Sequence, residues 1–129
     1  MNKPAILLID DDETSRDVIA RYLESEYDVD TTESGISALD MVKKRMYFMI
    51  LMDINLGEKY NGLEITQFIK EMPDYKGVPV VAVTAYAFER ERLKILAEGC
   101  DDYISKPFTR KEIIAKLKEV ESKFGLTSC

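Results

Sequence analysis

Five side chains in this sequence have the chemistry that phosphoryl transfer requires: three carboxylates, a hydroxyl and an ammonium. They are Asp10, Asp11, Asp53, Thr84 and Lys106. Each comes at or just beyond the end of a short apolar run, the position of a residue at the C-terminal end of a buried β-strand. In an open parallel sheet these strand ends line a crevice at one edge. The five side chains are therefore predicted to lie together in one crevice.

Three ionised carboxylates in one crevice predict a divalent cation. Two unit charges about 4 Å apart repel by roughly 4 kcal/mol at an effective dielectric constant near 20, and a dication cancels this repulsion. Mg²⁺ is the expected ion, with Mn²⁺ as a substitute, because Mg²⁺ accepts a few carboxylate oxygens and keeps waters that a phosphate can displace. The expected ligands are Asp10, Asp11, Asp53 and the backbone carbonyl of Asn55.

Asp53 is the expected nucleophile, because it follows the most buried of the predicted strands. A carboxylate that attacks phosphorus forms an acyl phosphate and divides one difficult transfer into two easier steps. The cation would neutralise one phosphoryl oxygen, the Lys106 ammonium a second, and the Thr84 hydroxyl would donate to the third. The sequence has no histidine, which excludes Ser-His-Asp and Cys-His centres and histidine-ligated zinc.

The elements that position these residues follow from the alternation of apolar runs with amphipathic segments, which is typical of repeated βα units. Strands are predicted at 5–9, 29–32, 48–52, 78–83 and 103–104. Right-handed crossovers with helices on both faces favour an α/β fold, a doubly wound five-stranded parallel sheet of the flavodoxin-like type with strand order 2-1-3-4-5. In this order the first and third strands are neighbours, which brings Asp10, Asp11 and Asp53 together.

Five helices are predicted between and after these strands. The first is expected to begin near Thr14 with a capping box that ends at Asp17, and Ser34, Gly62 and Thr109 are expected at the starts of the second, third and fifth. Apolar residues at helical spacing are predicted to face the sheet. They are Val18, Ile19, Tyr22, Leu23, Ile36, Leu39, Val42, Ile65, Phe68, Ile69, Met72, Ile113, Leu117, Val120 and Phe124. Leu93, Leu96 and Ala97 indicate the fourth helix, which is expected to end at Gly99.

Composition limits the class of protein. A chain of 129 residues with 46% hydrophobic and 33% charged residues is predicted to be one soluble domain, 1–129, with a core from about 3 to 124 and no effector domain. The net charge of −6 argues against direct binding to nucleic acid. No apolar stretch is long enough for a membrane span or a secretory signal, so a cytoplasmic location is expected. The two cysteines predict no disulfide framework, and Cys100 is expected to be buried.

Four motifs at the predicted strand ends resemble the receiver domain of two-component response regulators, the CheY-like superfamily. The motifs are Ile9-Asp10-Asp11, Leu51-Met52-Asp53-Ile54-Asn55, Val83-Thr84-Ala85 and Tyr103-Ile104-Ser105-Lys106-Pro107-Phe108. They stand in the order of that family, and the resemblance extends from about Lys3 to Phe124. Each motif alone is weakly specific, whereas the set of four is highly specific.

The resemblance implies a phosphoryl-acceptor site. It implies that Asp53 accepts the phosphoryl group, that Asp11 binds the metal directly and Asp10 often through water, and that the Asn55 carbonyl completes the ligand set. Thr84 and Lys106 are implied as phosphoryl-binding residues. In such domains the donor is a sensor histidine kinase or a phosphotransfer protein, and the domain later loses the phosphoryl group by its own catalysis.

The resemblance also implies how the signal leaves the site. Thr84 moves toward the phosphoryl group and Tyr103, as a switch aromatic, turns inward, which changes the partners of the face made by the fourth helix, the fifth strand and the fifth helix. A downstream protein or a second copy of the chain is the implied partner there. A cis peptide bond is implied between Lys106 and Pro107, and Asn55 and Tyr86 are implied to tune the lifetime of the phosphoryl group.

Two positions depart from the family pattern, and they leave the core site unchanged. Gly57 stands where the family often has proline, in a loop that is one residue longer than the commonest spacing. Asp12 adds a third acid, expected to be a solvated residue rather than a further ligand. Tyr103 also has a second interpretation, in which its ring simply packs at the sheet edge.

Three other functions are compatible with parts of the pattern. An FMN-binding flavodoxin would need a loop rich in Ser and Thr after the first strand, where this chain has acids that would repel a phosphate. A phosphatase of the haloacid dehalogenase type would have a second acid where Asn55 stands. An adaptor of the receiver fold that works without phosphorylation is the non-catalytic alternative. The chain is expected to be either a stand-alone regulator or a fragment of a larger regulator or hybrid kinase.

Overall fold

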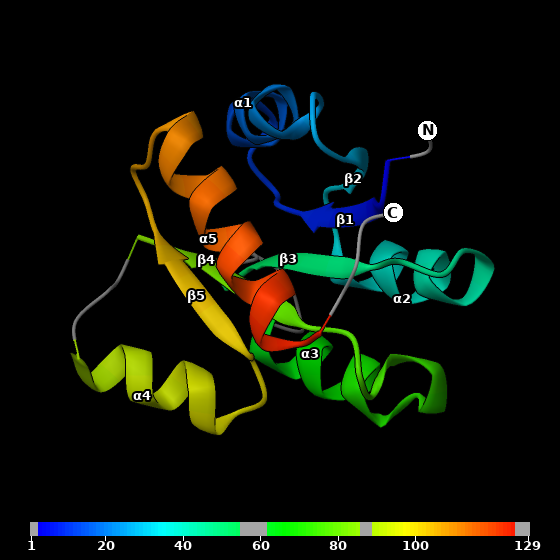
Figure 1. Cartoon of the computed structure of the whole chain (residues 1–129). Helices are drawn as coiled ribbons and strands as arrows, with labels where there is room; N and C mark the ends of the chain where they lie inside the picture. The colour runs from blue at the N-terminus through cyan, green and yellow to red at the C-terminus, as the bar shows by residue number, and fades with distance from the viewer. Residues whose placement is uncertain (1–2, 55–61, 86–88, 126–129) are drawn as a thin grey trace.

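In the computed structural model, which describes residues 3–54, 62–85 and 89–125, a five-stranded parallel sheet has the predicted order β2-β1-β3-β4-β5. The strands are β1 (Ala5–Ile9), β2 (Asp28–Thr32), β3 (Met49–Asp53), β4 (Val80–Thr84) and β5 (Asp102–Ser105). Five helices alternate with them: α1 (Glu13–Leu23), α2 (Gly35–Lys44), α3 (Gly62–Glu71), α4 (Glu89–Ala97) and α5 (Arg110–Lys123). Figure 1 shows the helices on both sides of the sheet. The predicted doubly wound α/β fold is confirmed.

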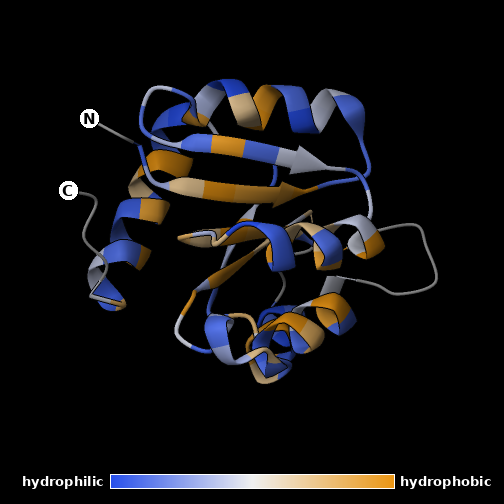
Figure 2. Cartoon of the chain, turned by 90° about the vertical axis from the view of Figure 1, so that its right-hand side faces the viewer, coloured by the Kyte–Doolittle hydropathy of each residue, from blue (hydrophilic) through white to orange (hydrophobic). Residues whose placement is uncertain are grey.

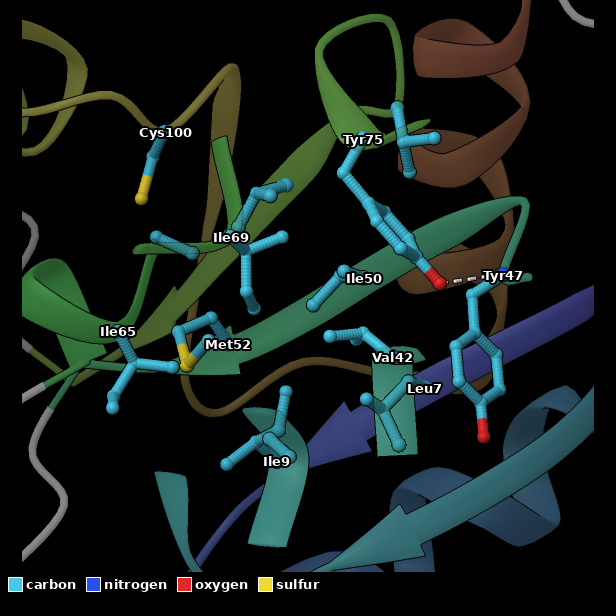
Figure 3. Packing of buried hydrophobic residues seen from close by; sticks show 14 of the residues in the cluster. Leu7, Ile9, Val42, Tyr47, Ile50, Met52, Ile65, Ile69, Tyr75 and Cys100 are labelled. Carbon is cyan, nitrogen blue, oxygen red and sulfur yellow. Dashed lines mark hydrogen bonds between the residues drawn. The ribbon is translucent and has the colours of Figure 1, made fainter. Parts of the chain in front are cut away.

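The sheet separates two apolar clusters, because successive residues of a strand point to opposite faces. One cluster joins Leu7 and Ile9 to residues of α2, α3 and α4 (Figure 3), and the other joins Ile6 and Leu8 to residues of α1 and α5. All residues of β3 are buried, as expected for a central strand. The edge strand β2 is mostly hydrophilic, with one hydrophobic residue between two aspartates, whereas the neighbouring β1 is hydrophobic throughout (Figure 2).

The predicted bounds of three strands were slightly misplaced, and the reason is the same for each. The strands β3, β4 and β5 continue for one residue beyond the apolar runs and include the polar residues Asp53, Thr84 and Ser105. Pro79 precedes β4 rather than lying inside it, and its carbonyl accepts a hydrogen bond from the N–H of Ile50 at 3.1 Å. A short 3₁₀ helix at Pro73–Tyr75 was not predicted. The polar site residues are therefore held by the sheet ladder itself.

The helix starts agree with the sequence for α2, for α3, which begins at Gly62 as predicted, and for α5, and they differ for α1. Ser34 caps α2, and Thr109 with Glu112 forms the predicted capping box of α5. The first helix, however, begins at Glu13, and its cap is Asp12, whose carboxylate accepts the N–H of Ser15 at 2.8 Å. The capping box predicted from Thr14 is wrong, because the Asp12 side chain already satisfies the first turn.

Several predicted inward-facing residues are in fact exposed: Val18, Ile36, Phe68 and Phe124. The predicted fourth helix is present as α4, but the apolar residues that indicated it lie mostly outside the core: Leu93 is 63% exposed, whereas Ile95 is 3% exposed. This helix buries only Ile95 against the sheet. In the described ranges, no helix is both long and apolar enough to pass through a membrane.

Candidate functional site

Asp10 lies directly after β1, and its carboxylate is fully buried among hydrogen-bond donors. Its Oδ1 atom accepts the backbone N–H of Asp12 at 2.9 Å. Its Oδ2 atom accepts the hydroxyl of Ser15 at 2.6 Å and the ammonium of Lys106 at 3.2 Å. The backbone is fixed as well, because the Asp10 carbonyl accepts the Arg16 guanidinium at 3.0 Å. The carboxylate is thus oriented by the first turn of α1 and by the segment after β5.

These donors determine the ionisation of Asp10. Burial alone would raise the pKa of this carboxyl, because it penalises the charged form. The Ser15 hydroxyl, the Asp12 N–H and the Lys106 ammonium oppose burial, and together they lower the pKa below its ordinary value. Asp10 is therefore an anion at neutral pH despite its burial.

Asp53 ends the central strand, and its position depends on a close approach by the start of α3. The N–H of Ile54 donates to the Val83 carbonyl at 3.2 Å, and the N–H of Gly62 donates to the Ile54 carbonyl at 3.2 Å. A Cβ atom at residue 62 would lie 2.3 Å from the carbonyl oxygen of Asp53 and 2.9 Å from the Cα atom of Ile54. Only glycine fits at this position without displacing the end of β3.

The structure brings Asp10, Asp11 and Asp53 together, as predicted. One carboxylate oxygen from each residue lies within 4.8 Å of the others. Asp10 and Asp53 are buried and Asp11 is exposed, so the cluster opens to solvent on one side. Hard oxygen ligands at this spacing suit a divalent cation such as Mg²⁺, which can also keep waters on its open side. The residues present therefore fit the predicted ion.

Lys106 and Thr84 complete the set at the neighbouring strand ends. The Lys106 ammonium lies 3.2 Å from Asp10 and 4.0 Å from Asp53, so it bridges the carboxylates. Thr84 is buried and pairs with Ser105 in the parallel register, and its carbonyl accepts the N–H of Lys106 at 2.8 Å. The peptide bond from Lys106 to Pro107 is cis, the geometry that the resemblance implies.

Tyr103 lies on β5 between cations from two helices. Its ring centroid is 4.8 Å from the Arg92 guanidinium of α4 and 5.8 Å from the Lys116 ammonium of α5. The ring is half-buried and packs against the cluster beneath α2, α3 and α4. Tyr103 thus contacts all three elements of the predicted output face.

Two predicted site residues, Asn55 and Tyr86, lie outside the described residues, as does the loop that contains Gly57. Sequence reasoning missed three residues that position the site: Ser15, Arg16 and Gly62. A signal existed only for Gly62, which was predicted merely as the start of α3. The hydrogen bonds of Ser15 and Arg16 to Asp10 depend on how α1 is rotated about its axis, and periodicity does not report this.

Known proteins with the same features were found by sequence and by structure. Residues 6–118 match the family model described as the response regulator receiver domain. The polar-differentiation response regulator DivK of Brucella ovis is 35% identical over 115 residues, which cover 88% of this chain and 93% of that protein. The chemotaxis response regulator CheY4 of Vibrio cholerae, at 23% identity, has the same fold with a TM-score of 0.87 over 92% of this chain and 99% of its own.

A solved receiver domain is similar in both sequence and fold. The receiver domain of the sensor histidine kinase PA1611 from Pseudomonas aeruginosa, solved with a magnesium ion coordinated in its active-site cleft, is 31% identical. It has a TM-score of 0.82 and covers 95% of this chain and 98% of its own. With an acidic cluster and a lysine at the ends of a 2-1-3-4-5 sheet, this chain belongs to the response regulator receiver domain family.

Proposed function

We propose that this chain accepts a phosphoryl group from the phosphohistidine of a sensor histidine kinase, or of a phosphotransfer protein, onto Asp53. The observation that carries the proposal is the acidic cluster of Asp10, Asp11 and Asp53 with the Lys106 ammonium 4.0 Å from Asp53. A buried carboxylate beside two further acids and one cation has the composition of a cation-dependent phosphoryl site.

Asp53, Lys106 and Thr84 have different roles in the proposed phosphoryl transfer. A carboxylate oxygen of Asp53 forms a bond to phosphorus as the bond from phosphorus to the donor nitrogen breaks. The donor ring, protonated on its other nitrogen, keeps the electron pair of that bond and leaves as a neutral imidazole. Lys106 would neutralise one phosphoryl oxygen, and Thr84 would donate its hydroxyl to another. Bound Mg²⁺, held by Asp10, Asp11, Asp53 and the carbonyl of Asn55, would supply further positive charge, and Mn²⁺ could replace it.

The approach to this site is open beside α1. A groove of about 310 Å³ lies next to Lys106, between α1 and the segment that follows β5, and its lining includes Val18, Tyr22, Pro107 and Phe108. Val18 is 40% exposed there. A donor protein that covers this apolar groove would bring its histidine to the open side of the carboxylate cluster.

The output of the domain is proposed to be a change in the α4-β5-α5 face. Tyr103 contacts cations of both helices, so a rotation of its ring would alter α4 and α5 together. Its movement with Thr84 would change the affinity of this face for a downstream protein or a second copy of the chain. Water would later hydrolyse the acyl phosphate and reset the domain, with Asn55 and Tyr86 tuning that rate.

This chemistry is proposed to take place in a single domain in the cytoplasm. Residues 1–129 are proposed to form one receiver unit that acts in the cytoplasm, where sensor kinases present their phosphohistidines. The net charge of −6 favours a protein partner over direct contact with nucleic acid. The chain is proposed to be a signalling domain that catalyses only its own phosphorylation and dephosphorylation.

The experiment is incubation with Mg²⁺ and acetyl phosphate, followed by intact mass spectrometry. The wild-type chain is expected to gain one phosphoryl group, and Asp53→Asn is expected to gain none. Asp40→Asn is the matched control, because Asp40 is exposed on α2 and pairs only locally with Lys44. Equal labelling of the Asp53→Asn variant, or labelling of the wild type that is unchanged by EDTA, would refute the proposal.

A further inference from the structure

We propose that Ser15 is a positioning residue for the cation site: its hydroxyl holds the Asp10 carboxylate in place when a bound dication or a phosphoryl group draws Lys106 away. The inference rests on the proposed function, since it concerns the same site. It adds a residue that none of the four strand-end motifs contains, because Ser15 lies inside α1.

The acceptor sites of Asp10 are almost fully used. An ionised carboxylate offers about four lone-pair positions, two on each oxygen. Oδ2 accepts both the Ser15 hydroxyl at 2.6 Å and the Lys106 ammonium at 3.2 Å, whereas Oδ1 accepts only the N–H of Asp12 at 2.9 Å. Among the described residues, these bonds leave one position, on Oδ1, for a cation or a cation-bound water. The two donors on Oδ2 therefore decide which way the remaining position points.

Of these two donors, Lys106 is the less permanent. Its ammonium stands between Asp10 and Asp53, at 3.2 and 4.0 Å, on a long flexible side chain that is 27% exposed. A dication that enters the cluster repels an ammonium, and a phosphoryl group on Asp53 attracts it. Both events draw Lys106 away from Asp10. The neutral hydroxyl of Ser15 is not repelled by the cation, so it keeps its hydrogen bond to Oδ2 of Asp10.

Ser15 is itself held on a rigid element. Its backbone N–H donates to the Asp12 carboxylate at 2.8 Å, which is the cap of α1, and the N–H of Arg16 donates to the Asp12 carbonyl at 2.9 Å. The Arg16 guanidinium donates a hydrogen bond to the Asp10 carbonyl. The loop after β1 and the first turn of α1 thus form one hydrogen-bonded unit. Within this unit, the hydroxyl of Ser15 orients the Asp10 carboxylate toward the cation site.

Removal of this hydroxyl should weaken cation binding. Partners that orient a metal-ligating carboxylate typically contribute 10- to 100-fold to metal affinity. Because two other donors remain on Asp10, the lower end applies, and Ser15→Ala is expected to raise the dissociation constant for Mg²⁺ by about tenfold. Ser15→Thr keeps a hydroxyl and is expected to bind nearly as well as wild type, whereas Ser15→Val, of the same shape without the hydroxyl, should resemble Ser15→Ala.

The helix α2 offers a matched control. Ser37 has the same place in its helix as Ser15 does, because its N–H donates to the side chain of the cap residue Ser34 at 3.0 Å. Its hydroxyl donates to the sulfur of Met41 at 3.8 Å rather than to a carboxylate. Ser37→Ala therefore reproduces any effect on helix stability and is expected to leave Mg²⁺ affinity unchanged.

The measurement is isothermal titration of the unphosphorylated full chain with MgCl₂, with folding of each variant checked by far-UV circular dichroism. The proposal is supported if affinity falls in Ser15→Ala and Ser15→Val but not in Ser15→Thr or Ser37→Ala. Unchanged affinity in Ser15→Val would overturn it while the proposed function stands. No Mg²⁺ binding by the wild type would instead overturn the proposed function. If Ser15→Ala does not fold, the Thr and Val pair gives the same decision.

Discussion

The substitution Gly62→Ala tests whether the start of α3 fixes the position of Asp53. The added Cβ atom would lie 2.3 Å from the Asp53 carbonyl oxygen and 2.9 Å from the Ile54 Cα atom. Both atoms belong to the backbone, so no side chain can rotate aside. An ordinary contact needs about 3.4 Å, which means that α3 and the end of β3 must separate by about 1 Å.

The energetic cost follows from this displacement. Overpacking of a buried site typically costs about 1–3 kcal/mol. Alanine in place of glycine returns at most about 1 kcal/mol of helix propensity, and less at the first residue of a helix. We expect the free energy of unfolding to fall by about 1–2 kcal/mol. Because a misplacement of about 1 Å can reduce a reaction rate by roughly 10²-fold, labelling of Asp53 by acetyl phosphate should slow by more than the stability change alone explains.

Urea denaturation followed by far-UV circular dichroism measures the first effect, and the rate of phosphoryl gain by intact mass measures the second. Gly77→Ala is the control, because a Cβ atom at residue 77 has no neighbour within 4 Å. It is expected to keep the wild-type rate and to gain up to about 1 kcal/mol through the unfolded state. If Gly62→Ala proved as stable and as quickly labelled as Gly77→Ala, the close approach of α3 would not position Asp53.

Two further predictions concern buried groups. Tyr27→Phe removes the hydroxyl that donates to the buried Glu121 carboxylate at 2.5 Å, and should lower the free energy of unfolding by about 2 kcal/mol in urea. Burial and Glu121 raise the pKa of Tyr27 well above its usual range, so above about pH 10 only the unfolded chain loses this proton. Stability should then fall as pH rises, and less steeply in Tyr27→Phe. Burial also raises the pKa of the Cys100 thiol to about 11. In a Cys129→Ser background at pH 9, the native chain should therefore react with a thiol reagent at least about 50-fold more slowly than the chain in urea, because only the thiolate reacts. Equal rates would contradict the burial of Cys100.

The order of the sheet and the grouping of the acids were predictable because they depend on patterns that the sequence carries locally. The buried strands β1, β3 and β4 are runs of apolar residues that leave few alternatives to a central position. The polar residues at the C-terminal ends of these strands then lie at one edge of the sheet. Asp10 and Asp53 were therefore predicted to lie close together. The cap of α2 at Ser34 was predictable for the same local reason.

The rotation of helices about their axes was less predictable. In α4 the apolar residues Leu93 and Leu96 indicated a helix but not its buried face, and tertiary contacts select Ile95 for the core. The helix α1 begins at Glu13, one residue before Thr14, because the exposed Asp12 caps it. The hydrogen bond from Ser15 to Asp10 depends on that rotation and start, and therefore could not be read from spacing.

The two apolar clusters share the same strands in alternation: in β3, Ile50 and Met52 belong to one cluster and Met49 and Leu51 to the other. A residue inserted into this strand would exchange the two sets and move Asp53 along the sheet by about 3.3 Å. Such an insertion would disrupt both apolar clusters and separate Asp53 from the other site residues. The length of the strand from Met49 to Asp53 is therefore fixed, and we expect insertions and deletions to be tolerated only in the connections between elements.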